Sequence, residues 1–166
     1  MESKETTSFD SRDSWQEAIN AAPNPNWIKS RDLGGGRKSK YLPVTVQQAL
    51  ADVFFLEIDV IEIKQSVIVN EIVTTVKISI LPSYPNSEHR IISGVGSKPI
   101  QMRAGGVASS FPERKLTNSL EYCSPASKSA ALSNALASFG NVFGRNLGRK
   151  VSDGFNLSKN KKKKKK

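Results

Sequence analysis

The middle of the chain has the hydrophobic pattern of β-structure. Residues 57–69 (EIDVIEIKQSVIV) alternate apolar and acidic positions, and residues 71–81 (EIVTTVKISIL) are β-branched almost throughout. Asn70 lies between the two segments, which predicts an antiparallel hairpin. After a turn at PSYPNSE, residues 89–97 (HRIISGVGS) predict a third strand. These segments together predict an antiparallel meander.

Helical spacing of apolar residues predicts helices on both sides of this meander. Residues 45–55 (TVQQALADVFF) carry an apolar stripe, with Thr45 as the candidate N-cap. Nearer the N-terminus, a short helix is expected to run from Ser14 to about Asn20. Ser14 is its candidate N-cap, because Glu17 follows three residues later.

A longer helix is expected near the C-terminus, beginning near Ser124 with Pro125 in its first turn. In residues 129–148 (SAALSNALASFGNVFGRNLG), apolar residues at steps of three and four share one helical face: Leu132, Leu136, Phe139, Phe143 and Leu147. Gly140 and Gly144 interrupt this pattern, although each costs a helix interior roughly 1 kcal/mol relative to Ala. We expect the apolar stripe to cover the sheet. The small, nearly neutral opposite face would admit a neighbouring protomer or a DNA backbone, and the glycines would allow close approach or a bend.

The order helix, meander, long helix predicts an α+β domain with one face of the sheet covered. Residues 98–123 have no clean period and are expected to form a long, mobile loop. Residues 1–13 are charged and Ser/Thr-rich, and residues 151–166 are low-complexity and end in lysines, so both are predicted to be disordered. Residues 14–150 then form a single domain.

The net charge of +10 is concentrated at the C-terminus, where Lys159 and residues 161–166 supply seven positive charges and leave +3 for residues 1–158. A basic balance fits a polyanionic partner such as nucleic acid, and fits an anionic membrane surface less specifically. The hexalysine run is either an artefact or native. A native run would raise the local DNA concentration and could recruit acidic partner proteins.

The cysteine content and the N-terminal sequence indicate the cellular compartment of the protein. Cys123 is the single cysteine, which excludes an intramolecular disulfide and favours an intracellular setting. The N-terminal residues lack the apolar core of a signal peptide, and no apolar run approaches the roughly 20 residues that span a membrane. We expect a soluble, cytoplasmic protein without a membrane partner.

The segment GGGRKSK, residues 34–40, superficially resembles a phosphate-binding loop. The nucleotide motif needs Gly directly before Lys-Ser, but Arg37 precedes Lys38 here, and no acidic magnesium-binding strand follows. A nucleotide site is therefore disfavoured. The glycines favour a tight turn that delivers Arg37, Lys38 and Lys40 to the phosphates of a polyanion. An ordinary basic surface loop is the alternative.

The sequence contains few combinations of residues that could form a catalytic site. With one His and one Cys, the chain offers no zinc-type cluster and no convincing nucleophile–base pair. His89 is expected to be exposed or hydrogen-bonded on a strand, and Cys123 to be a small buried residue. Glu57, Asp59 and Glu62 fit the solvated face of a strand better than a metal site. We predict that the protein is not an enzyme and uses no cofactor or metal.

Aromatic residues bracket the glycine segment. Trp27 and Tyr41 lie close in sequence to Lys29 and Arg31. Base stacking combined with phosphate contact holds single strands without sequence preference. Trp27 fits a core position at least as well, so only Tyr41 is assigned to the binding site.

Two sequence motifs, in the order given below, resemble those of a known protein family. A Ser-Arg-x-x-Gly-Gly-Gly-x-Lys-x-x-Tyr run spans Ser30 to Tyr41, and a Ser-Phe-Gly-Asn run spans Ser138 to Asn141, with the predicted meander between them. From Trp27 to Leu147, the chain resembles the single-strand annealing proteins of the Rad fifty-two superfamily, which include phage recombinases of the Sak type.

The resemblance implies a β-β-β-α core, an antiparallel meander packed on a long helix. It also implies protomers joined side by side into rings or helical arcs, with single-stranded DNA in a basic outer groove and its bases exposed for pairing. ATP is not used, because neutralised phosphates suffice to bring complementary strands together. The implied role is in homologous recombination and repair, in the host cytoplasm if the protein is phage-encoded. A single-strand binding protein or an exonuclease is a candidate partner.

The chain departs from this family on the long helix. The eukaryotic members of the family have a basic cluster that faces DNA just before the Ser-Phe-Gly run, where this chain has Ser133, Asn134 and Ala137. A family arginine after the tyrosine of the glycine segment is also replaced, near Val46. We therefore expect DNA contacts from a different set of residues: Lys29, Arg31, Arg37, Lys38, Lys40, Tyr41, Lys98, Arg103, Lys128 and Arg145.

Two function classes stay open. A homo-oligomeric annealing protein is favoured, because unpaired sheet edges would join neighbouring protomers. The alternative is a monomeric or dimeric nucleic-acid-binding accessory protein that does not anneal, for instance an RNA-binding module. An enzyme acting on nucleic acid is disfavoured by the missing catalytic groups.

Overall fold

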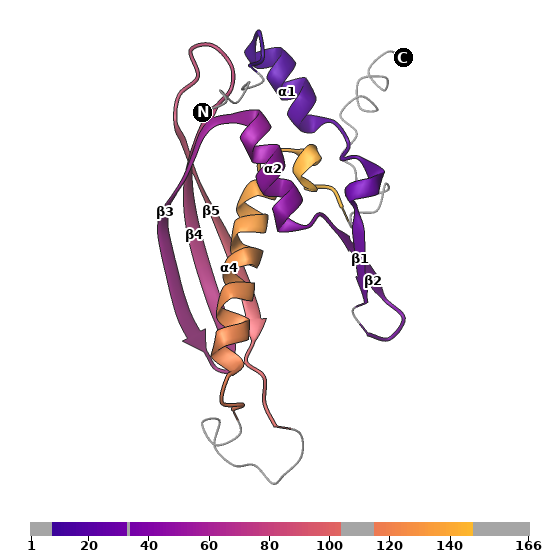
Figure 1. Cartoon of the computed structure of the whole chain (residues 1–166), viewed down its shortest axis with the longest axis vertical. Coiled ribbons are helices and arrows are strands. Elements are labelled where there is room, and N and C mark those ends of the chain that lie inside the picture. Colours follow the sequence, from indigo (N-terminus) through magenta and orange to yellow (C-terminus); the bar gives the residue numbers. More distant parts are fainter. Residues whose placement is uncertain (1–7, 33, 104–114, 148–166) are drawn as a thin grey trace, which may run out of the picture.

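The computed structural model describes residues 8–32, 34–103 and 115–147. This part of the chain is α+β, with three α-helices and two antiparallel sheets (Figure 1). Its elements in chain order are α1 (Arg12–Asn20), the 3-10 helix η1 (Pro25–Trp27), β1 (Lys29–Asp32), β2 (Lys38–Tyr41), α2 (Val44–Phe54), β3 (Phe55–Ile68), β4 (Glu71–Pro82), β5 (Arg90–Pro99), α4 (Ser119–Ala137) and the 3-10 helix η2 (Asn141–Phe143).

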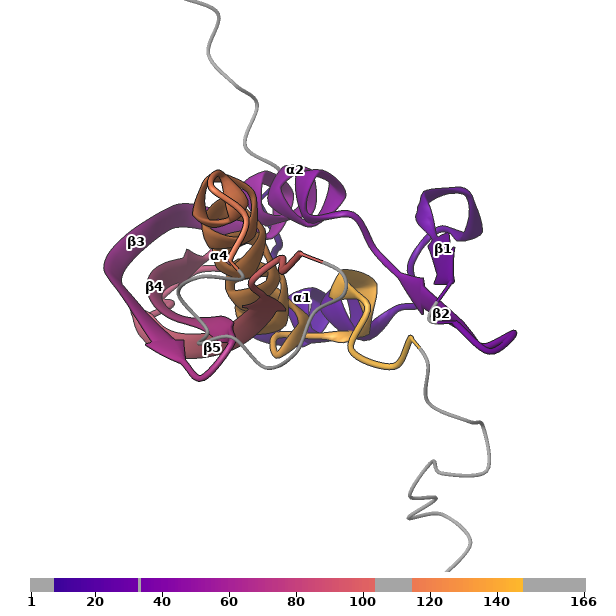
Figure 2. The same cartoon turned by 90° about the horizontal axis from the view of Figure 1, so that it is seen from below.

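The three long strands form the predicted meander, in the order β3-β4-β5. Along β4, every second side chain from Ile72 to Pro82 is buried, because these side chains face α4. The helix packs on β4 and β5, and the sheet curves around it (Figure 2). The flank of β3 that faces α4 is thereby left partly open.

Small residues bring α4 close to the sheet. A Cβ added at Gly96 would lie 2.4 Å from the amide nitrogen of Ala131, and one added at Gly94 would lie 2.1 Å from the Ala131 carbonyl oxygen. Beside these contacts, the buried hydroxyls of Thr74 and Ser127 are 2.6 Å apart and share a hydrogen bond. The position of α4 on the sheet is therefore set by backbone contact and one buried polar pair.

Aromatic rings fill the core between α1, α2 and η2. Phe55 stacks on Phe143 with ring centroids 5.8 Å apart, and the buried Trp15 donates a hydrogen bond from Nε1 to the Phe54 carbonyl oxygen at 2.8 Å. Phe9 stacks on Phe54 at 5.4 Å. The segment before α1 thus belongs to the core, although residues 8–13 were predicted to be disordered.

The start of α1 differs from the prediction. Its N-cap is Ser11, whose Oγ accepts a hydrogen bond from the Ser14 amide, while the Ser14 side chain bonds back to Ser11. The predicted cap, Ser14, is instead the third helical residue of this capping box. Similarly, Thr45 lies inside α2, which begins at Val44 without a side-chain cap.

The bounds of α4 also differ. The helix begins at Ser119, so part of the predicted loop is helical and Pro125 lies inside the helix. It ends at Ala137, well before the predicted end of the apolar stripe. Gly140 then passes the backbone of Ile19 so closely that a Cβ would lie 2.2 Å from the Ile19 oxygen, and Gly144 has a left-handed φ of +91°. These two glycines allow the chain to leave the helix and fold back on α1.

Candidate nucleic-acid interface

The glycine segment forms the turn of the β1–β2 hairpin, which projects from the body on the side opposite β3 (Figures 1 and 2). Gly34, Gly35 and Gly36 have φ values of +82°, +61° and +74°, a region that residues with a Cβ rarely adopt. Asp32 fixes the turn, since its Oδ1 accepts a hydrogen bond from the Gly34 amide at 2.7 Å. The predicted tight turn is therefore present.

The hairpin displays cations on both of its faces. Lys29 pairs with Tyr41, and Arg31 pairs with Ser39, so Lys29, Arg31 and Tyr41 share one face. The guanidinium carbon of Arg31 lies 5.8 Å from the Tyr41 ring centroid, within cation–π range. This contact holds a cation beside an aromatic ring that is 38% exposed.

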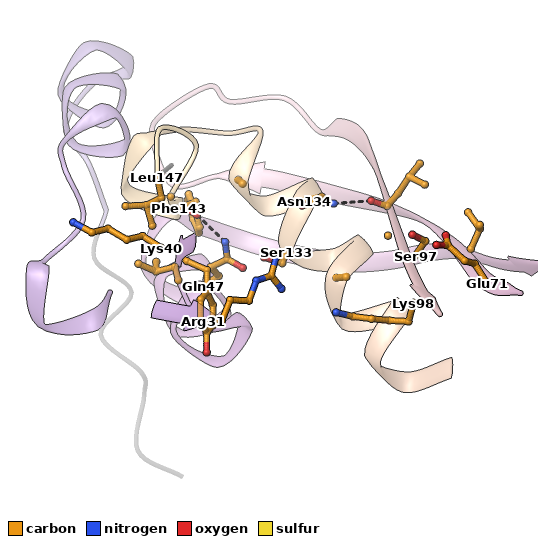
Figure 3. Close-up of a pocket in the computed structure, with 18 residues that line it drawn as sticks. Arg31, Lys40, Gln47, Glu71, Ser97, Lys98, Ser133, Asn134, Phe143 and Leu147 are labelled. Carbon is orange, nitrogen blue, oxygen red and sulfur yellow. Dashed lines mark hydrogen bonds between the residues drawn. The ribbon is translucent and has the colours of Figure 1, made fainter. Parts of the chain in front are cut away.

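A groove of about 630 Å³ runs between the hairpin, the edge of β5 and α4. Arg31 and Lys98 line it from different elements, and Figure 3 shows their side chains pointing toward each other. Lys40 also lines the groove, but its amine points away from the other labelled side chains (Figure 3). The groove thus contains two cations that face each other.

The surface between these cations comes from α4. Its lining residues are small or uncharged: Ala130, Ser133, Asn134 and Ala137. Asn134 is tied to the edge of the sheet, because its Nδ2 donates to the Val95 carbonyl oxygen at 2.6 Å. These uncharged residues of α4 therefore form one wall of the groove.

Gln47 is a lining residue that sequence reasoning missed. It comes from α2, is 2% exposed, and donates from Nε2 to the Phe143 carbonyl oxygen at 2.7 Å. Its Oε1 is buried without a hydrogen-bond partner. Helical spacing could have predicted that Gln47 is buried, since it shares a helical face with Leu50, Ala51 and Phe54, all of them buried.

The structure brings four of the ten predicted site residues to the groove: Arg31, Lys40, Tyr41 and Lys98. Lys29, Arg37 and Lys38 lie on the same hairpin but do not line the groove. Arg103, Lys128 and Arg145 lie outside the lining as well. Arg145 donates from Nε to the Ala137 carbonyl oxygen at 3.4 Å. Trp27, left open between core and surface, is 39% exposed beside α2.

The acidic residues of β3 lie away from this groove. Glu57 and Asp59 are exposed, as predicted. Glu62 bridges Lys64 and Lys77, and the hydrogen bonds from these two ammonium groups lower the pKa of its carboxyl to about 2. His89 is exposed, with Nδ1 3.3 Å from the Ser79 hydroxyl and Nε2 3.6 Å from Glu57. Within the described ranges, no three His, Cys, Asp or Glu side chains gather as a metal site would require.

Comparison with known proteins leaves the function open. No protein-family model matches the chain, and no curated protein matches it. Among the helices of the described residues, none is long and apolar enough to cross a membrane. The functional argument therefore depends on the groove.

Proposed function

We propose that the protein binds single-stranded DNA in the groove between the β1–β2 hairpin and α4, and anneals complementary strands as a homo-oligomer without ATP. The observation that carries the proposal is the pair of facing cations, Arg31 and Lys98 (Figure 3), in a groove that Tyr41 of the hairpin also lines. Cations that are spaced along a groove beside an exposed ring provide the two contacts that hold single strands, phosphate neutralisation and base stacking.

The shape of the hairpin supports phosphate contact beyond the groove itself. Arg37 and Lys38 continue the basic surface outward from Arg31 toward the glycine turn, and Lys29 lies at the base of the hairpin on exposed β1. A strand leaving the groove at the hairpin end would pass these residues. Their long side chains can follow a flexible backbone without a fixed geometry, as sequence-independent binding requires.

Assembly is supported by the flank of β3. Val60, Ile63 and Val67 pair with β4 residues that face α4, so all three lie on the helix side of the sheet. They are 48%, 43% and 55% exposed. An apolar row on a long edge strand invites association with another chain. Because the row and the hairpin lie on opposite sides of the molecule, protomers joined through it would leave each groove open (Figure 2).

The resemblance to the Rad fifty-two superfamily agrees with this proposal in fold order and in the place of the glycine hairpin. It differs in the source of the cations, which we assign to the hairpin and β5. The proposed setting, recombination and repair of phage type in the host cytoplasm, depends on that resemblance alone.

The proposal is tested by fluorescence anisotropy with a labelled single-stranded oligonucleotide over a range of salt concentrations. Arg31→Gln and Lys98→Gln remove one groove cation each and should weaken binding. Each change should also reduce the slope of log K against log salt by about 0.7, the value for one phosphate contact on a single strand. Arg12→Gln removes an exposed cation outside the groove and should leave the slope unchanged.

Annealing is measured separately, with complementary oligonucleotides and no ATP. An unchanged salt slope in both groove variants would remove the groove from the site. Tight binding without acceleration of pairing would instead favour the non-annealing accessory protein.

A further inference from the structure

The two carboxamides that line the groove are both oriented by the fold. Asn134 donates its Nδ2 hydrogen to Val95 O at 2.6 Å, and Gln47 donates its Nε2 hydrogen to Phe143 O at 2.7 Å (Figure 3). An amide whose nitrogen is engaged by a carbonyl presents its oxygen to any further partner. Both residues therefore offer the groove an acceptor.

The Gln47 oxygen lacks a partner within the described part of the protein. It is buried, and a buried polar atom without a hydrogen bond is costly to the fold. Its nitrogen is held at good hydrogen-bonding distance, so a flip of the amide would leave the nitrogen unpaired and bring two carbonyl oxygens together. A ligand that supplies a donor would satisfy this oxygen.

The two amide oxygens favour a donor over a phosphate beside them. Phosphate oxygens only accept hydrogen bonds, so the amide oxygens repel them. Along a DNA strand, N–H donors occur only on the bases. Arg31 and Lys98 suit phosphates, whereas the two amide oxygens suit a base.

We propose that the groove holds a nucleobase whose N–H groups donate to the amide oxygens of Asn134 and Gln47, while the flanking phosphates reach Arg31 and Lys98. This inference rests on the proposed single-strand binding and adds a base preference to it. Cytosine and adenine present an exocyclic amino group, which matches an acceptor. Thymine presents a single N3–H between two carbonyl oxygens, which would face the amide oxygens of the groove. Amino-bearing bases are therefore preferred over thymine.

The test compares labelled dC20 with dT20, because both are flexible pyrimidine strands of equal charge. The full-length protein should bind dC20 about fivefold more tightly at the same salt concentration, as expected for one additional net hydrogen bond. Asn134→Leu removes one acceptor and Gln47→Met the other, and each should reduce the preference. Asn20→Leu is the matched control, because Asn20 likewise donates to a backbone carbonyl, that of Gln16, outside the groove.

The outcomes separate this inference from the proposed function. Equal and tight binding of dC20 and dT20 would overturn the base preference and leave single-strand binding intact. A lack of binding to either strand would overturn the proposed function itself. A preference that persists in both Asn134→Leu and Gln47→Met would overturn the assignment of these acceptors. Tighter binding of rU20 than of dC20 would assign the acceptors to the sugar 2′-hydroxyl in place of the base.

Discussion

Single residues in this protein are placed by local electrostatics as well as by burial, and Glu62 is the clearest case. Its carboxylate lies between Lys64, two residues along β3, and Lys77, its cross-strand partner on β4. The ion pairs join the two strands on the sheet face opposite α4. Because the three side chains are near solvent, the ion pairs should contribute little to the free energy of unfolding, and salt should reduce that contribution.

Glu62 predicts an acid-sensitive contribution to stability. Its pKa in the folded state is about 2, lowered by Lys64 and Lys77 from an ordinary value of 4.5. A lowered pKa stabilises the fold above pH 4.5, and this contribution is lost as the pH falls from 4.5 to 2. In Glu62→Gln, urea denaturation should therefore show a shallower loss of stability across this window. The difference from the wild type should shrink in 1 M NaCl, and an equally steep loss in both proteins would contradict the assignment.

Elements in this fold are held by close backbone contact, which is most severe where α4 crosses β5. At Gly96, an added Cβ would meet Ala131 N at 2.4 Å and Ser127 O at 2.7 Å, both of them backbone atoms. Because both the strand and the helix meet here through backbone atoms, α4 and β5 have little room to accommodate an added side chain. The separation between helix and sheet therefore depends on the absence of a Cβ at Gly96, as it does at Gly94.

Gly96→Ala is expected to destabilise the protein by about 2 kcal/mol or more, through overpacking between α4 and β5. Chemical denaturation measures the change. Ser93→Ala is the control, because Ser93 is exposed on the same strand and its truncation removes no core contact. A stability equal to that of the wild type would show that α4 can move away from β5 at no cost. The groove would then be adjustable as well, since α4 and β5 form two of its sides.

The elements differ in how far the sequence predicts them. The meander was predicted with bounds close to those observed, because period-two alternation and β-branching are local signals. The start of α4 was not, since Pro125 was assigned to a first turn although it lies inside the helix. The end of α4 was missed because Phe139, Phe143 and Leu147 continue a helical spacing after the helix has stopped. These residues stay near the core through the turn at Gly144, a tertiary arrangement that spacing alone does not encode.

The candidate site was predictable in its charges and in Tyr41, but not in its geometry. Arg31, Lys40 and Lys98 were named from residue type, and the glycine turn indicated why cations gather on the hairpin. Which of them share a groove depends on how the hairpin lies against β5, a contact between segments distant in sequence. The acceptor role of Asn134 was not predictable, because it follows from a hydrogen bond to the backbone of another element.

At the scale of the whole molecule, charge and apolar surface are separated. The basic hairpin lies on one side, whereas the acidic Glu57 and Asp59 and the apolar row of β3 lie on the other (Figures 1 and 2). In head-to-tail association, the apolar row of one protomer would contact a different surface of the next, away from the hairpin and its groove. Such association closes into a ring or continues as a helical arc.

The apolar row predicts how assembly can be broken. Light scattering should give the wild type a mass many times 18.2 kDa. Ile63→Lys places a charge in the middle of the row, where burial against a second protomer would leave it unpaired, so it should shift the mass toward that of the monomer. Val69→Lys is the control, because Val69 is 83% exposed at the β3–β4 turn and lies outside the row. Equal loss of mass in both variants would show that added charge alone disrupts assembly, and a monomeric wild type would contradict the ring and the arc together.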